Sequence, residues 1–236
     1  MSSPRASGVP GPGPEAPGVP GPAYGERTPS RLARFEDAFP GFRPQIVAGS
    51  YLLTPVKPHD GATVHRLWGA LAGQLPDDWG LAGDIAVPFD AENEFCPDLA
   101  VLPETEAAKD LIAYPPELLA LVAEVVSPGT AHTDYEVKDR AHARRGIPHY
   151  LVLDPYRARC RVLWNPGADG YLGRETVPYG SVVTVEGGGS RVPGAAGLGR
   201  LTVDTTGFPV DPSARRAAGR DGPGAPRAPW SVGGAG

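Results

Sequence analysis

Apolar residues alternate or run together in several short stretches of this 236-residue chain, and these stretches predict a sheet-rich fold. Residues 45–54 are expected to form a β-hairpin, because two apolar runs flank the turn-forming cluster Ala48-Gly49-Ser50. Residues 118–126 are almost continuously apolar, which is typical of a strand buried on both faces. Further strands are expected over 81–89, 98–102, 149–153, 159–164 and 171–177, with short strands continuing to 185 and a polar turn at 90–95.

Three other segments carry helix signals. In 63–75 the apolar residues recur at steps of three and four, after a break expected at Pro55 and Pro58. In 133–145 Thr133 and Glu136 have the spacing of a capping box, and Gly146 marks the end of the helix. A short helix is also expected over 31–39.

The order of these elements predicts an α/β fold with a mixed central β-sheet flanked by helices, an N-terminal β-hairpin and a β-rich C-terminal part. Residues 1–30 and 212–236 are rich in Pro, Gly and Ala. Such segments bury too little apolar surface to offset chain entropy, so both are expected to be disordered tails. Residues 31–211 are expected to form one domain.

Charge and cysteine content exclude several classes of protein. The formal net charge is −5 and the sequence pI is about 5.5, so the chain is not a globally basic nucleic-acid binder. Cys96 and Cys160 form no Cys-x-x-Cys motif, and two buried small side chains are favoured over a disulfide between them. There is no apolar run of membrane-spanning length and no signal-peptide pattern, so a cytoplasmic location is expected.

Two carboxylates within apolar strands are the main chemical signal. Asp98 heads one predicted strand after Pro97, and Glu124 lies inside the next. A buried charge is costly unless it is paired or bound to a metal. Two such carboxylates on neighbouring strands can bind a hard cation, which lowers the pKa of a bound water and stabilises charge on a phosphate. Lys138, on the following helix, could then orient the attacking water.

The predicted helix carries further charge. Asp134, Lys138 and His142 are four residues apart and share one helix face, with Arg145 close to the same stripe. If this face turned toward the carboxylates, it could contact backbone phosphates.

Simpler interpretations stay open. Asp98 could cap a turn, Glu124 could pair with a core arginine, and Asp134 with Lys138 could form an ordinary solvated salt bridge. The other candidates are expected to be structural histidines or solvated acids rather than ligands: His65, His132, His149, Asp84 and Glu94.

Four separated motifs carry a resemblance to a known family. They are Pro97-Asp98-Leu-Ala-Val, Glu124-Val-Val-Ser-Pro, Asp134-x-x-x-Lys138 and Gly146-Ile-Pro-His-Tyr-Leu-Val-Leu-Asp154-Pro. In this order they resemble the Uma-two family (“putative restriction endonuclease”), a branch of the PD-(D/E)XK nuclease superfamily. The resemblance covers roughly residues 45–203 and implies a restriction-endonuclease-like α/β core. It implies Asp98 and Glu124 as metal ligands and Lys138 as the lysine of the site.

The chain departs from the family pattern at three positions. The superfamily lysine two residues after the second acid is replaced by Val126, and the resemblance to this branch of the superfamily points instead to Lys138 on the following helix. A glutamate of the family hairpin is replaced by Gln45, and a helix tyrosine by His142. His65 matches a family histidine at the head of the first helix.

The resemblance implies a metal-dependent DNA endonuclease that uses Mg²⁺, with Mn²⁺ as an alternative, and that would release 5′-phosphate and 3′-hydroxyl ends. DNA is the expected partner, a homodimer is possible for cutting both strands, and no membrane partner is expected. The alternative is a catalytically inactive module of the same fold that binds nucleic acid or protein. A third interpretation is a structural partner protein that works through its Pro/Gly-rich tails.

Overall fold

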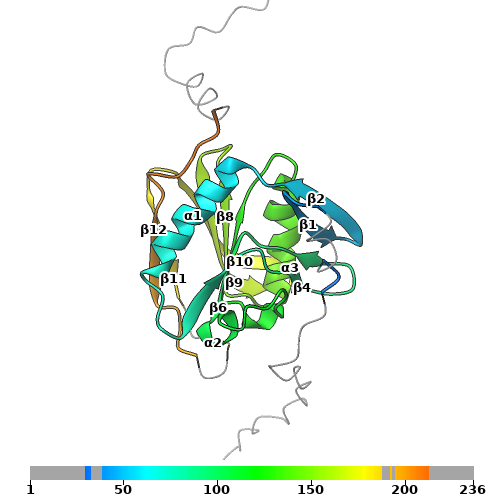
Figure 1. Ribbon diagram of the computed structural model, residues 1–236. Coiled ribbons are helices and arrows are strands. Elements are labelled where there is room, and N and C mark those ends of the chain that lie inside the picture. The colour runs from blue at the N-terminus through cyan, green and yellow to red at the C-terminus, as the bar shows by residue number, and fades with distance from the viewer. Residues whose placement is uncertain (1–29, 33–38, 188–191, 193–194, 213–236) are drawn as a thin grey trace, which may run out of the picture.

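A mixed six-stranded sheet forms the centre of the molecule. The computed structural model describes residues 30–32, 39–187, 192 and 195–212. The strand order in the central sheet is β10-β9-β8-β7-β6-β3 (Figure 1), and all neighbours are antiparallel except the parallel pair β7 and β8. The predicted mixed α/β class is therefore confirmed. Its strands are β3 (Trp79–Ala82), β6 (Leu99–Pro103), β7 (Leu121–Val125), β8 (His149–Asp154), β9 (Arg159–Gly167) and β10 (Gly170–Pro178).

Different elements cover the two faces of this sheet. Helix α1 (Pro58–Ala72) and the two-stranded sheet of β11 (Val182–Glu186) and β12 (Arg200–Asp204) pack on one face. Helix α3 (Lys138–Arg144), preceded by the π-helix η3 (Thr133–Val137), packs on the other (Figure 1). Because side chains alternate along a strand, Leu99 and Val101 of β6 face α1, whereas Ala100 and Leu102 face α3.

The predicted hairpin is confirmed and belongs to a second sheet of order β2-β1-β5-β4. Strands β1 (Phe42–Val47) and β2 (Ser50–Pro55) are joined by Ala48 and Gly49, both with positive φ (47° and 77°), as a tight hairpin turn requires. Strand β1 also pairs with β5 (Glu94–Phe95), which pairs with β4 (Val87–Pro88). The short helices α2 (Glu104–Ala107) and η2 (Pro116–Leu118) complete the list of named elements.

Several predicted boundaries are wrong. Helix α1 begins at Pro58, which does not break structure but opens the helix, since the first turn needs no backbone donor there. The single strand expected over 81–89 is interrupted at Asp84, whose φ is 53°, and the expected turn at 90–95 contains β5.

The end of the helix around Lys138 agrees with the sequence, but its start does not. Thr133 does not cap the helix, because the preceding residue His132 is already helical. The predicted capping box of Thr133 and Glu136 is therefore absent. At the other end Gly146 has a φ of 70°, and its amide donates to Ala143 O while Ile147 N donates to His142 O. These are the two bonds of a glycine-terminated helix.

Both cysteines are free and buried, as predicted. In the part of the chain that the structure describes, no helix is long and apolar enough to cross a membrane. Most of the helix expected over 31–39, and the tails expected over 1–30 and 212–236 apart from Ser30 and Pro212, lie outside the described residues.

Candidate active site

Asp98 and Glu124 lie next to each other on neighbouring strands, as the sequence predicts. Asp98 directly precedes β6, and Leu99 pairs with Ala123, so continuing the register places Asp98 beside Glu124. The amide of Val125 donates to Asp98 Oδ2 at 2.7 Å, which fixes the carboxylate against β7. Both side chains are buried.

Lys138 reaches Glu124 from the covering helix. Its Nζ lies 2.7 Å from Glu124 Oε1 and 3.0 Å from Asp134 Oδ1, and the lysine side chain is fully buried. Asp134 and Lys138 do pair, but the interpretation of this pair as a solvated surface salt bridge is wrong, because both side chains are buried. The interpretation that Glu124 pairs with a core arginine is also wrong, because its partner is Lys138. Glu124 projects from β7 toward α3, so a helix lysine meets it without leaving the core.

The helix face that carries these residues turns into the protein. His142 is buried and its ring packs against Phe89 and Tyr150, with ring centroids 5.2 Å and 4.6 Å away. Burial, helped by the charge of Lys138, lowers the pKa of His142, so the imidazole is neutral. The expectation that this face contacts phosphates is wrong, because Asp134, Lys138 and His142 are all inaccessible to a duplex.

Arg43 supplies a second cation. From β1 its guanidinium donates to Asp98 Oδ1 and, at 2.8 Å, to Asp84 Oδ1. Asp98 is therefore held by an arginine on one oxygen and by a backbone amide on the other. Sequence analysis missed Arg43, since no spacing rule links a hairpin arginine to a carboxylate 55 residues away.

The site holds more carboxyl groups than cations. Three buried carboxylates, Asp98, Glu124 and Asp134, face two cations, Arg43 and Lys138. Burial is the main cause that raises the pKa of Glu124 to about 8, and the neighbouring Asp134 and Asp98 add to it against the opposing effect of Lys138. Burial also raises the pKa of Asp98, although Arg43 opposes the rise.

Lys138 stays charged in this setting. Burial alone would lower its pKa, but Asp134 and Glu124 outweigh that effect and raise it. A buried, permanently charged ammonium between two carboxylates orients both of them, because each must keep its oxygen toward the same nitrogen.

A narrow cleft opens onto these carboxylates. Asp98, Glu124 and Asp134 line it together with Gln45 of β1 and Asp60 of α1. Gln45 Oε1 and Asp60 Oδ1 are buried there without a hydrogen-bond partner. Hard oxygen atoms of this kind suit Mg²⁺ or Mn²⁺. Among the described residues, however, no group of three or more His, Cys, Asp or Glu side chains is close enough to hold a metal ion.

The remaining sequence candidates lie elsewhere or have other partners. Asp84 is exposed and pairs with Arg43. Glu94 was expected to be solvated, but it is buried and accepts hydrogen bonds from the Ser30 hydroxyl and the Arg31 amide. His65 and His132 are exposed, and His149 is buried in β8, where desolvation lowers its pKa to about 4. Asp60 was missed as a cleft residue because its position near the start of α1 looks like an ordinary helix-terminal acid.

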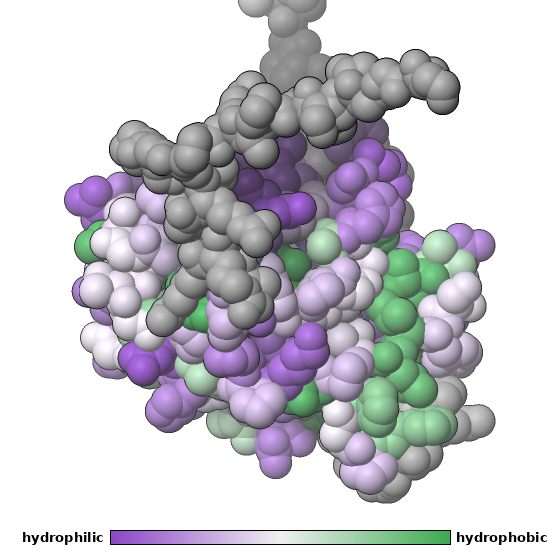
Figure 2. Space-filling view, turned by 90° about the horizontal axis from the view of Figure 1, so that it is seen from above, coloured by the Kyte–Doolittle hydropathy of each residue, from purple (hydrophilic) through white to green (hydrophobic). Residues whose placement is uncertain are grey.

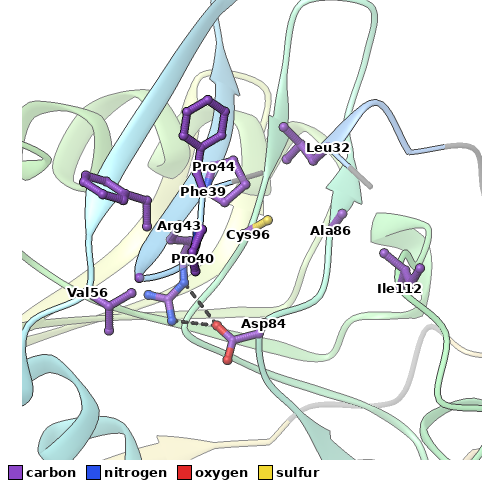
Figure 3. A pocket seen from close by; sticks show the side chains of 12 residues that line it. Leu32, Phe39, Pro40, Arg43, Pro44, Val56, Asp84, Ala86, Cys96 and Ile112 are labelled. Carbon is purple, nitrogen blue, oxygen red and sulfur yellow. Dashed lines mark hydrogen bonds and ion pairs between the residues drawn. The ribbon is translucent and has the colours of Figure 1, made fainter. Parts of the chain in front are cut away.

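An apolar cavity of about 280 Å³ lies beside the carboxylate cleft (Figure 3). Arg43 and Val56 line both spaces. Its rim includes the exposed side chains of Phe39, Phe42 and Ile112. Seen from above, hydrophobic residues gather along one side of the molecule (Figure 2).

Comparisons with known proteins point to one family. A search of solved structures lists the crystal structure of “a putative nuclease belonging to DUF820” from Anabaena variabilis ATCC 29413, with 13% sequence identity, a TM-score of 0.48, and coverage of 59% of this chain and 79% of that chain. A search of curated proteins found no match. The model of the Uma2 family, described as “Putative restriction endonuclease”, matches residues 31–189, and the chain belongs to this family.

Proposed function

We propose that this chain is a metal-dependent endonuclease that hydrolyses phosphodiester bonds of DNA. The observation that carries the proposal is the buried set of Asp98, Glu124 and Lys138, whose two carboxyl groups line a narrow cleft, in a chain of the Uma2 family. Buried ionisable groups cost stability, so a set with more carboxyl groups than cations beside a cleft is better explained by a cation and an anionic substrate than by structure alone.

In this proposal Asp98 and Glu124 are the ligands of Mg²⁺, with Mn²⁺ as an alternative. The Val125 amide and Lys138 keep the two carboxylates oriented, and the unpartnered oxygens of Gln45 and Asp60 are available to bind ordered water in the cleft. Lys138 keeps a positive charge next to the expected position of the attacking water. The bound cation would lower the pKa of that water and offset the charge of the phosphate. Attack by water in line with the leaving group would release 5′-phosphate and 3′-hydroxyl ends.

A plasmid-nicking assay with Mg²⁺ or Mn²⁺ tests this function. Wild type should nick, whereas Asp98→Ala and Lys138→Ala should not. In parallel, the cation should raise the melting temperature of wild type but not of Asp98→Ala, since a ligand stabilises only the state that binds it. No nicking together with no thermal response would contradict the proposal.

The second candidate is a catalytically inactive module that binds nucleic acid or protein. Two observations favour it: Gln45 stands where an acid would complete the carboxylate set, and Arg43 already neutralises Asp98. That module would bind DNA without nicking it, and its melting temperature would not respond to the cation.

A further inference from the structure

A group of cations surrounds one tyrosine next to the carboxylate cleft. The guanidinium carbons of Arg157, Arg159 and Arg161 lie 5.7, 5.4 and 5.8 Å from the ring centroid of Tyr135. We call these four residues the tyrosine–arginine cluster. Like charges gathered on one ring repel one another, so the cluster needs a physical reason.

Strand register places the cluster close to the proposed site. On β9 Arg161 lies opposite Val152 of β8, and Val152 lies opposite Glu124 of β7. Register partners point to the same face of a sheet, so Arg161 and Glu124 project from the same side, two strand spacings or about 10 Å apart. Tyr135 belongs to η3, next to Asp134.

A buried carboxylate anchors the tyrosine. Tyr135 donates its hydroxyl proton to Asp154 Oδ2 at 2.8 Å, while Asp154 Oδ1 accepts the amides of Tyr156 and Arg157 at 3.0 and 2.9 Å. Burial and the hydrogen bond to Asp154 raise the pKa of Tyr135, which keeps the phenol neutral. The ring is thus a fixed platform for the guanidinium groups.

Among the described residues, two of the three arginines have no carboxylate partner. Within the described ranges, no ion pair joins Arg159 or Arg161 to an acid. A guanidinium nitrogen of Arg157 lies 3.7 Å from Asp154 Oδ2, the oxygen that also accepts the hydroxyl proton of Tyr135. The guanidinium donors of Arg157 are accessible, since its side chain is 56% exposed. For a chain with a net charge of −5, this is a local concentration of positive charge.

Lys57 connects the cluster with the cleft. At the start of α1 its Nζ donates to the hydroxyl of Tyr156 at 3.2 Å and lies 5.6 Å from the centroid of that ring. Asp60, three residues further along, lines the cleft. The cations therefore form a path from the carboxylates across the β8–β9 turn to β9.

We infer that Lys57, Arg157, Arg159 and Arg161 bind the backbone phosphates of a nucleic acid beside the bond that is cut. This inference rests on the proposed function and names its substrate-binding surface. Guanidinium groups fixed on a ring present paired N–H donors that match phosphate oxygens. Phosphate contacts position the strand without reading its sequence.

The test is the salt dependence of binding in EDTA, where no cleavage occurs. Fluorescence anisotropy of a labelled DNA duplex would be followed in full-length wild type, Arg159→Gln/Arg161→Gln and Arg159→Lys/Arg161→Lys. The matched control is Lys109→Gln/Arg200→Gln, which removes two cations that pair with Glu106 and Glu186 and do not belong to the tyrosine–arginine cluster. A single-stranded RNA of the same length, tested in parallel, shows which backbone is preferred.

Each phosphate contact contributes about −0.9 to the slope of log K against log salt concentration on duplex DNA. The Gln double variant should lose about two contacts, so its slope should become shallower by roughly 2, while the Lys variant and the control should keep the wild-type slope. An unchanged slope in the Gln variant, or no binding of either nucleic acid by wild type, would overturn the inference. If wild type shows the predicted slopes but never nicks DNA with Mg²⁺, the surface is supported and the proposed catalysis is not.

Discussion

The two faces of the central sheet have the same strands but different interiors. Toward α1, β6, β7 and β8 present mainly apolar side chains: Leu99, Val101, Leu121, Ala123, Val125, Leu151 and Leu153. By alternation the buried His149 of β8 lies on the same side, and burial keeps its imidazole neutral. Toward α3, the alternate positions of the same strands place Glu124 among Ala100, Val122, Tyr150 and Val152, where it meets Lys138.

This difference shows that the fold does not require the charged side chains of the α3 face. The α1 face shows that these strands can be closed by packing that is almost entirely apolar and to which they contribute no buried charge. On the α3 face, Glu124, Asp134 and Lys138 replace apolar contacts with charges whose desolvation is costly even when they are paired. Because the same alternation could have produced a second apolar layer, the charged group is best explained by function.

Glu124→Gln should have the largest effect on activity and almost none on the fold. Substitutions behind a metal ligand already cost about 10–100-fold, so loss of the ligand charge should lower nicking by more than about 100-fold. Its melting temperature at neutral pH should equal or exceed that of wild type, since the amide keeps the shape and removes a buried ionisable group. Glu117→Gln, an exposed glutamate paired with Arg145, is the matched control. Wild-type nicking by Glu124→Gln would remove Glu124 from the site.

Lys138→Met and Leu151→Ala compare the two faces directly. The first leaves two buried carboxylates without their cation and should lower the free energy of unfolding by about 3–5 kcal/mol at neutral pH. The second leaves a cavity on the α1 face and should cost about 2–5 kcal/mol. The distinguishing measurement is denaturant unfolding as a function of pH.

In acid the penalty of Lys138→Met should shrink, because the orphaned carboxylates can take up protons, whereas that of Leu151→Ala should stay constant. If the loss of unfolding free energy depended on pH equally in both variants, the ionisation of the buried carboxyl groups on the α3 face would not contribute to the effect of Lys138→Met.

Local sequence patterns predicted much of the fold. The apolar run ending at Val126 and the Ala48-Gly49 turn each depend on neighbouring residues, and both were found. The sequence placed Asp98 and Glu124 on neighbouring strands, facing each other if the register allowed, and the observed register brings them side by side. A proline such as Pro58 has two opposite local meanings, helix start and helix break, and only the tertiary structure decides between them.

The rest of the site depends on contacts between distant residues. Arg43, Asp98 and Glu124 come from β1, the start of β6 and β7, and nothing in the pattern of the hairpin shows where the side chain of Arg43 will end. The spacing of Asp134 and Lys138 gives their pairing but not their burial, since the same i,i+4 pair on a different helix face would be solvated.

The pH dependence of stability should also separate the faces. Burial raises the pKa of Glu124 from its ordinary value of 4.5 to about 8 in the native state. Between these two pH values the native protein retains a proton that the unfolded chain has lost. Its contribution is therefore fully present below about pH 4.5 and is lost as the pH rises toward 8. Urea unfolding should show wild type losing stability relative to Glu124→Gln across this window. His149 acts in the opposite direction as pH falls from 6.5 to 4, but it is common to both proteins and cancels.

Arg43→Ala should sharpen the response of the α3 face to metal. Removing the guanidinium frees an Asp98 oxygen and leaves the carboxylate without its counter-cation. A charged hydrogen bond contributes about 1.5–3 kcal/mol, so Mg²⁺ should stabilise the variant at roughly tenfold lower concentration than wild type. The readout is the melting temperature across an Mg²⁺ titration. A weaker response than that of wild type would mean that Arg43 helps to build the cation site.

Asp84→Asn should have the smallest effect on stability and on the response to Mg²⁺, because it removes the exposed partner of Arg43. Asp84 holds the other end of the Arg43 guanidinium, but its side chain is 78% exposed. An exposed ion pair contributes about 0–1 kcal/mol, so unfolding in denaturant should change by less than that. The Mg²⁺ midpoint should stay near that of wild type, because Arg43 keeps its contact with buried Asp98. A midpoint shifted as far as in Arg43→Ala would show that Arg43 is positioned by its exposed partner, and that the electrostatics of the α3 face extend to the surface.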